Sequence, residues 1–587
     1  MISDLPILAK FLIVFVTFNI FVAGLHVKVS GRVSLFEGIL LNLLWAVSIY
    51  ATVCTQFRSI YTVSLIGIPV YYFRQGLIKP VMPWREILPS LLIANLIWCI
   101  FFINYFVLDG LQFRVPHVDF IISSRLAYYN DLIGVENTRG FYNLFEKGSS
   151  NEIYHYFELW FMNVGNFLNR QGRLFNAMFL VFPTIAFMTY VGLKQLVKSA
   201  SLFLPLLLLL GVLTITNPYD FIWQSLGLHL PLSGIGNIFL NLKHLLILPI
   251  IIYVLSSISE DTLDDLLVCL VSLIYPLIIP VLLPSIILFR LYQHRFKIKS
   301  ISPILVIFTM AAGIFMLLNS PGPSDIASGS YLNPKLLGKI FFVGLLVPVV
   351  SFCFIFFVDY GIIQLRIKRI FIFLGIADII ALSLWLILHE NIDANQFFSI
   401  PFCSILVLMA TLALYSLFKK RLYWFAAAGC ILYIIPFINE YKELGFVSTP
   451  ENLKGLANAI PNEAKVLYIP LKSEIHNIYD YTERMSNPIN SIFLIREDLH
   501  VINIAASLAP PFKLDNPIRN SMFEYARSIS PYYNQCGEFD QNNLTCLFLF
   551  LQRNQIRYLL ADSKINFGGK VKLIKEDDNG RTLYSFE

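Results

Sequence analysis

The sequence predicts an α-helical polytopic membrane protein with a small C-terminal α/β soluble domain, and three observations lead to this fold class. Of the 587 residues, 57% are hydrophobic and 14% are charged, whereas soluble chains carry about 25% charged residues. The charged residues cluster, and long runs between them, such as 202–216 and 341–358, are almost entirely apolar. Beyond residue 440 the charged residues return and the apolar runs shorten to strand length.

A helix needs about 20 mostly apolar residues to cross a bilayer, because every backbone polar group there requires a partner within the helix. Apolar runs and their charged boundaries predict about 13–14 transmembrane helices in residues 1–439. The candidate spans are 6–26, 34–55, 59–73, 87–107, 153–169, 174–192, 200–216, 238–258, 266–289, 301–319, 340–360, 369–388, 398–418 and 422–438. The first lacks a basic n-region and a cleavage site, so we expect it to be retained.

Basic residues in short loops tend to remain in the cytoplasm, which predicts the orientation. By this rule a large loop at about 108–152 lies outside, and so does the C-terminal domain, residues 440–587. The basic loops of the N-terminal and C-terminal halves of the chain give consistent orientations only if the number of crossings between the two halves is adjusted. Either 153–169 crosses, which places Lys194 and Lys198 outside against the rule, or the run Pro276, Pro280 and Pro284 forms a broken or re-entrant helix.

The C-terminal domain is predicted to be α/β, because short apolar strands alternate with helices. Strands are expected at 466–470, 501–504 and 556–561, with a helix near 547–553 and a second helix from 450 to about 459. A closing hairpin, 571–575 with 582–586, is expected around Asp578-Asn579-Gly580. Cys536 and Cys546 are predicted to form a disulfide in an oxidising compartment, the alternative being two unrelated thiols. The domain has no glycine-rich phosphate loop, metal-spaced Cys/His cluster or nucleophile elbow.

The outward loop and the following segment contain the candidate functional residues. Residues 119–134 are predicted to form an amphipathic helix at the membrane surface, with Ile122, Leu126, Tyr129 and Ile133 on its apolar face. Asp119 would lie at its N-terminus, where it is either a helix cap or a reactive carboxylate. The nearby ionisable side chains that favour a site are His117, Arg125, Glu136, Arg139, His155 and Glu158.

Glu158 and His155 are three residues apart and would share a helix face. Ionisable groups at membrane depth usually mark a functional path or cavity. The alternative is a structural pair that faces a neighbouring helix. Gly134 is expected to end the surface helix.

The run from His117 and Asp119 through Gly134-Val135-Glu136-Asn137 to 154–160 resembles bacterial members of the GT-C superfamily of integral membrane glycosyltransferases. The segment 548–562 resembles the end of such proteins. The chain differs from many members because about four predicted spans precede the loop and because Asp119 is not part of an acidic pair. The resemblance implies a multi-pass protein of the bacterial cytoplasmic (inner) membrane.

The resemblance also implies a sugar donor linked to polyprenyl phosphate or pyrophosphate and a glycan, lipid or protein acceptor. Asp119 would be the general base for the acceptor hydroxyl, with Glu136 as the second candidate catalytic residue. Positive groups at His117, Arg125, Arg139 or His155 would neutralise the leaving phosphate, and Glu158 is a further candidate for substrate binding. No cofactor is required by this pattern, and a requirement for a divalent cation stays open.

Two other classes of function compete with a transferase. The first is a polysaccharide polymerase or flippase-type transporter, although transporters often show paired broken helices and this chain has one proline-interrupted stretch. The second is a non-catalytic membrane scaffold, which would tolerate substitution of Asp119, His155 and Glu158. The formal net charge of +6 is explained by cytoplasmic loops that contact anionic membrane lipid, and it does not indicate nucleic-acid binding.

Overall fold

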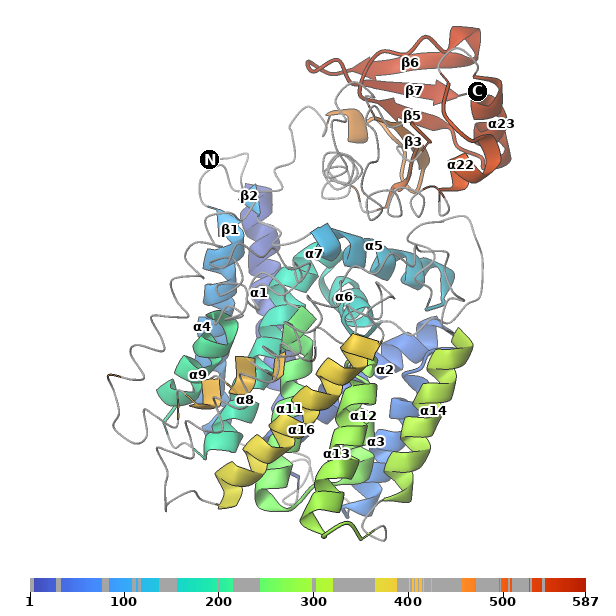
Figure 1. Cartoon of the computed structure of the whole chain (residues 1–587). Coiled ribbons are helices and arrows are strands. Elements are labelled where there is room, and N and C mark those ends of the chain that lie inside the picture. The colour runs from blue at the N-terminus through green and yellow to red at the C-terminus, as the bar shows by residue number, and fades with distance from the viewer. Residues whose placement is uncertain are drawn as a thin grey trace.

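The computed structural model of the chain is mostly helical and ends in a small sheet domain (Figure 1). In the helical part the structure describes residues 5–27, 33–76, 84–107, 112–113, 118–136, 156–198, 201–214, 243–297, 302–319 and 365–387, with scattered positions between 401 and 424. In the C-terminal part it describes residues 455–470, 496–508 with gaps, 527, 530–540 and 544–586. The helices form a bundle, and the sheet lies beyond one of its ends (Figure 1).

Among the described residues, five helical segments are long and apolar enough to cross a membrane. They belong to α1 (Leu5–Leu25), α2 (Leu35–Cys54) and α4 (Trp84–Tyr105), and to two longer segments. The first, Arg173–Val197, is formed by α7 (Arg173–Asn176) and α8 (Phe182–Val197), and the second, Pro276–Gln293, ends with α13 (Ile279–Gln293). Shorter apolar helices include α9 (Phe203–Thr214), α11 (Lys243–Glu260) and α14 (Pro303–Asn319). The remaining described helices of the bundle are α3 (Thr62–Arg74), α5 (Val118–Ile133), α6 (Tyr156–Asn169), α12 (Asp265–Ser272) and α16 (Leu365–Ile387).

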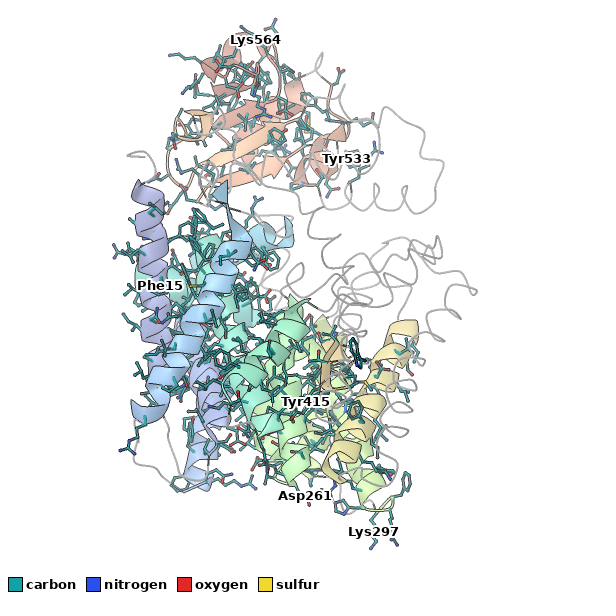
Figure 2. The ribbon with its side chains drawn as sticks, turned by 90° about the vertical axis from the view of Figure 1, so that its left-hand side faces the viewer. Phe15, Asp261, Lys297, Tyr415, Tyr533 and Lys564 are labelled. Atoms are coloured by element: carbon teal, nitrogen blue, oxygen red, sulfur yellow. A yellow bond between two sulfur atoms is a disulfide. The ribbon has the colours of Figure 1, made fainter. Side chains whose placement is uncertain are left out.

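One end of the bundle carries an acidic turn, Glu260–Asp265, that pairs with basic residues from four helices. Glu260 lies 3.1 Å from Lys198, at the end of α8, and Asp261 lies 3.9 Å from Arg369 of α16. Arg74 of α3 lies 3.9 Å from Asp264, and Arg290 of α13 lies 2.5 Å from Asp265. Figure 2 shows Asp261 and Lys297 at this end, opposite Tyr533 and Lys564 of the sheet domain. Lys198 therefore lies with the other basic residues.

The segment predicted as the span 266–289 is a hairpin that enters and leaves the bundle at this same end. Asp265, at the start of α12, accepts a hydrogen bond of 2.9 Å from Arg290, near the end of α13. A continuous helix would separate these residues by about 37 Å. The chain turns between them through Pro276–Ile278, a single 3₁₀ turn. The structure thus shows the broken helix of the second alternative, with Pro276 in the turn that interrupts the helical hydrogen bonds.

The other alternative, a crossing at 153–169, corresponds to α6, which the structure describes from Tyr156 to Asn169. Its 14 residues span about 21 Å, less than the roughly 30 Å of a bilayer core. Figure 1 shows α6 beside α5 at the end of the bundle nearest the sheet domain. From there α7 and α8 run the length of the bundle to Lys198.

The α7–α8 segment contains one π-helical turn, Ala177–Val181. A π turn shifts the backbone hydrogen bonds by one residue and can release a carbonyl group for another donor. Here the Trp98 indole N–H donates to the carbonyl of Phe179 over 2.8 Å. This bond attaches α4 to α7–α8.

The C-terminal domain contains a five-stranded sheet in the order β4-β3-β5-β7-β6. The strands are β3 (Lys465–Ile469), β4 (His500–Asn503), β5 (Tyr558–Ala561), β6 (Val571–Glu576) and β7 (Thr582–Phe586). The first three are parallel, and β7 and β6 complete the sheet as an antiparallel hairpin. Gly580 in the hairpin turn has a φ of +76°, a conformation that suits glycine. The predicted strands, the hairpin and the helix α23 (Thr545–Arg553) are all confirmed.

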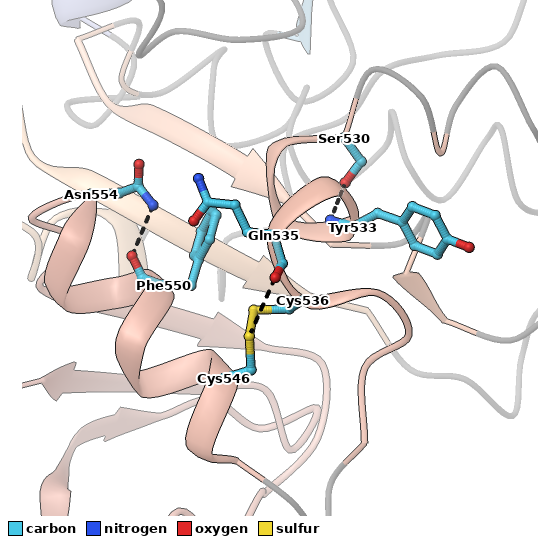
Figure 3. Close-up of a disulfide and its surroundings, with 7 residues drawn as sticks. All are labelled: Ser530, Tyr533, Gln535, Cys536, Cys546, Phe550 and Asn554. Atoms are coloured by element: carbon cyan, nitrogen blue, oxygen red, sulfur yellow. Dashed lines mark hydrogen bonds between the residues drawn. A yellow bond between two sulfur atoms is a disulfide. The ribbon is translucent and has the colours of Figure 1, made fainter.

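Alternate residues of the sheet face two separate apolar cores, as the two-residue period of a strand requires. Leu467 and Leu559 belong to the core under α22 (Pro531–Cys536) and α23, whereas Val466 and Leu560 pack on Leu456 on the opposite face. Helix α22 was not predicted. Cys536 at its end is bonded to Cys546 in α23, with 5.7 Å between the two Cα atoms (Figure 3). The predicted disulfide is therefore present.

Candidate functional site at the α5 end of the bundle

Helix α5 begins where the sequence predicts, and Asp119 is its second residue. The backbone of Asp119 is described, whereas its side chain lies outside what the structure describes. His117, Arg139 and His155 also lie outside the described residues. An acidic residue in the first turn is favoured by the positive end of the helix dipole. The position fits both the capping and the reactive interpretation.

The middle of α5 is buried on both sides, which differs from a helix resting on a membrane surface. Leu126 and Tyr129 are buried as predicted, but Arg125 and Asn130, which lie off the predicted apolar face, are also only 8% and 0% exposed. For Arg125 the reason is the C-terminal domain. Arg125 Nη2 donates a hydrogen bond of 2.6 Å to the carbonyl of Val501 in the edge strand β4.

A second contact joins α5 to the same strand. The rings of Tyr128 and His500 lie 6.1 Å apart. Burial, together with the nearby Arg125 guanidinium, lowers the pKa of His500, so the imidazole is neutral at neutral pH. A neutral ring beside Arg125 avoids repulsion between two cations. The C-terminal domain and the 108–152 loop therefore meet at one end of the bundle.

On its other side α5 is attached to the bundle by a polar cluster centred on Arg173. The Arg173 guanidinium donates to Asp131 over 2.8 Å and to the side-chain oxygen of Asn163, and it lies 4.8 Å from the centre of the Tyr128 ring. Asp131 also accepts a hydrogen bond of 3.0 Å from the Tyr50 hydroxyl. Sequence analysis did not identify Arg173 or Asn163, because, apart from each other, their partners come from α5, about 30–50 residues earlier in the chain. The available signal was a polar residue inside a nominally apolar segment.

Gly134 ends α5, as the sequence predicts, and has a φ of +66°. A Cβ atom there would come within 2.7 Å of the carbonyl oxygen of Cys54, so the position requires glycine for space as well as for conformation. The close approach brings the following residues against the α2–α3 loop. Glu136 is placed in this way.

The carboxylate of Glu136 is buried, with 1% exposure, and accepts three hydrogen bonds. The donors are the Ser59 hydroxyl at 2.5 Å, the backbone N–H of Ile60 at 3.2 Å and the Trp160 indole at 2.8 Å. Burial raises the pKa of Glu136 to about 7, although the three hydrogen bonds act in the opposite direction. These contacts connect the α2–α3 loop to α6 and favour a structural role for this predicted catalytic residue.

Glu158 lies in the first turn of α6 and is 1% exposed. Its predicted partner on the same helix face, His155, is outside the described residues. Across the described part of the chain, no three His, Cys, Asp or Glu side chains are grouped closely enough to hold a metal ion. The described cluster is therefore one of hydrogen bonds and ion pairs.

No protein-family model matches the chain, and a comparison with curated proteins finds no match. The site is therefore described by its geometry. Helix α5 carries Asp119 in its first turn and is held between the helical bundle and the edge of the C-terminal sheet. Such a helix can present its N-terminal residues at a fixed position between two domains, where ligand sites often occur.

Proposed function

We propose that the chain is a membrane glycosyltransferase of the GT-C kind, which moves a sugar from a polyprenyl-phosphate donor to a glycan, lipid or protein acceptor. The observation that supports this most directly is the placement of α5. It carries Asp119 at its start, lies at one end of an apolar bundle and is covered by the C-terminal domain through Arg125. This is the arrangement expected of a site that receives a lipid-linked donor from the bilayer and an acceptor from water.

In the proposed reaction Asp119 takes the proton of the acceptor hydroxyl as the oxygen attacks the anomeric carbon of the sugar. The bond between that carbon and the phosphate oxygen breaks, and polyprenyl phosphate leaves. Positive groups beside the leaving phosphate would stabilise the developing charge. His117, Arg139 and His155 are the candidates, because Arg125 already donates to Val501.

We base the proposed topology on the arrangement of the bundle. The α12–α13 hairpin and the short α6 remove two of the predicted crossings, which leaves about twelve. The acidic turn and its basic partners then face the cytoplasm. The N-terminus, α5 and the C-terminal domain all lie on the outer face of the membrane, so the donor would be used there.

The test uses full-length protein in lipid nanodiscs with a panel of radiolabelled polyprenyl-phosphate-linked hexoses and pentoses, and with a mixture of glycan, lipid and protein acceptors that carry free hydroxyl groups. A general base contributes about 100- to 10,000-fold, so Asp119→Asn should reduce release of polyprenyl phosphate by at least the lower factor. Asp578→Asn is the matched control, because Asp578 is exposed in the β6–β7 turn. Full turnover by Asp119→Asn removes Asp119 from the mechanism. Absence of turnover by the wild type with every donor contradicts the function itself.

The α12–α13 hairpin is the one observation that favours a transporter instead, since broken helices often line transport sites. The two functions differ in their products. A transferase breaks the sugar–phosphate bond, whereas a flippase moves the intact lipid-linked sugar across the bilayer. Recovery of intact donor in the opposite leaflet would therefore favour the transporter.

A further inference from the structure

Asp378 lies in the middle of α16, as the fourteenth of its 23 residues. It is 0% exposed, and both carboxylate oxygens are buried without a hydrogen-bond partner among the described residues. Neighbouring residues on the same helix face, Leu374 and Ala381, are apolar and fully buried. Asp378 therefore combines complete burial with the absence of a described partner for either oxygen.

Among the described residues, the two helices with the most extensive contacts to α16 supply no counter-charge at the level of Asp378. α16 contacts α11 and α13, and Phe373 packs edge-to-face on Phe289 of α13 with 5.8 Å between the ring centres. The charged and titratable side chains of these three helices, apart from Asp378, are Lys243, His244, Tyr253 and Glu260 in α11, Arg290 and Tyr292 in α13, and Arg366, Lys368 and Arg369 in α16. All except the neutral phenol Tyr253 lie in the terminal turns. Arg369 is about 13 Å below Asp378 along the helix.

An ionised carboxylate in this position would lose its hydration and gain no hydrogen bond or counter-charge from the described residues in return. The loss of hydration disfavours the ionised form, and buried acids respond by binding a proton. A metal cation is a poorer occupant than a proton, because hard cations require about six oxygen ligands. Neither α11 nor α13 places a second acidic side chain at this depth. A proton requires only the carboxylate itself.

We propose that Asp378 is a proton-binding site in the interior of the bundle. Its carboxyl group is protonated in this conformation, and the proton is released to water only when the packing of α11, α13 and α16 opens. Release converts the carboxyl group to a carboxylate, and the proton passes to the water that enters. Proton binding at Asp378 thereby stabilises the closed packing of these three helices. This inference stands independently of the proposed transferase activity.

The first test is chemical labelling of full-length protein in lipid nanodiscs. The apolar reagent dicyclohexylcarbodiimide adds to protonated carboxyl groups in apolar surroundings and leaves a stable N-acylurea that peptide mass spectrometry detects. Asp378 should be labelled at acidic and neutral pH, with loss of labelling at alkaline pH. A water-soluble carbodiimide should not label it. Absence of apolar labelling across the pH range would show an ionised, partnered carboxylate, and protection by sodium ions would show a metal site; either result overturns the proposal.

The second test asks whether protonation of Asp378 is coupled to the packing of the three helices. Hydrogen exchange is compared as protection factors, which correct for the base-catalysed intrinsic rate at each pH. The protection factors of α11, α13 and α16 should fall at alkaline pH in the wild type. Asp378→Asn keeps the shape of the side chain without a titrating proton, so its protection factors should not change with pH. Asp378→Leu serves as a second neutral variant in case asparagine disturbs the packing. If the protection factors of the wild type are as insensitive to pH as those of both variants, the coupling is refuted.

Discussion

Arg125→Leu tests whether α5 holds the C-terminal domain in place. In the wild type the guanidinium donates to the Val501 carbonyl over 2.6 Å and is buried between the two domains. A hydrogen bond from a charged donor contributes about 1.5–3 kcal/mol. Its loss should therefore weaken docking of the domain by about 10- to 150-fold. Leucine fills part of the volume but leaves the carbonyl without this donor.

Hydrogen exchange followed by mass spectrometry measures this effect directly. Amides of α5 and of the edge strand β4 should exchange faster in Arg125→Leu, because undocking exposes both elements to water. Peptides from β5 and β7 should keep their protection, since those strands lie inside the sheet. Arg553→Leu is the matched control: it removes the same charge from an exposed position on α23.

Acidification should act in the same direction as the substitution. The pKa of His500 is lowered in the docked state, so docking is favoured at neutral pH and weakens as pH falls and the imidazole takes up a proton. The protonated ring would repel Arg125. Unchanged exchange of α5 and β4 in Arg125→Leu, or an equal change in Arg553→Leu, would refute the view that Arg125 joins the two domains.

Two further predictions concern the bundle. Because burial raises the pKa of Glu136 from 4.5 to about 7, the free energy of unfolding should fall by about 3 kcal/mol as pH rises between these values. Glu136→Gln should flatten this pH dependence. An equal change of the unfolding free energy with pH in both proteins would contradict the prediction. With native cysteines replaced, Lys198→Cys and Lys297→Cys should be labelled by an impermeant thiol reagent from one side of the membrane and Asp578→Cys from the other. Labelling of Lys198→Cys from the same side of the membrane as Asp578→Cys would contradict the re-entrant hairpin.

The sequence by itself determined the elements whose physics is local. Long apolar runs specify helices, and short continuous apolar runs specify buried strands such as Val466–Ile469. The glycine after α5, the Asp-Asn-Gly hairpin and the paired cysteines were also predictable, because each depends on residues close together in the chain. These features match the structure within a few residues.

The environment of each site residue was decided only by the tertiary structure. Arg125 lies on the polar face of α5 by local pattern, yet it is buried because Val501, 376 residues later, accepts its hydrogen bond. Glu136 is an acidic residue of the kind that can act in catalysis. Its carboxylate, however, accepts hydrogen bonds from Ser59 and Trp160, which belong to two other elements. The proline run is compatible with a crossing until Asp265 and Arg290 are seen to pair. Hydrogen bonds and ion pairs between distant segments leave no periodic signal in the sequence, so only the folded chain shows which charges meet.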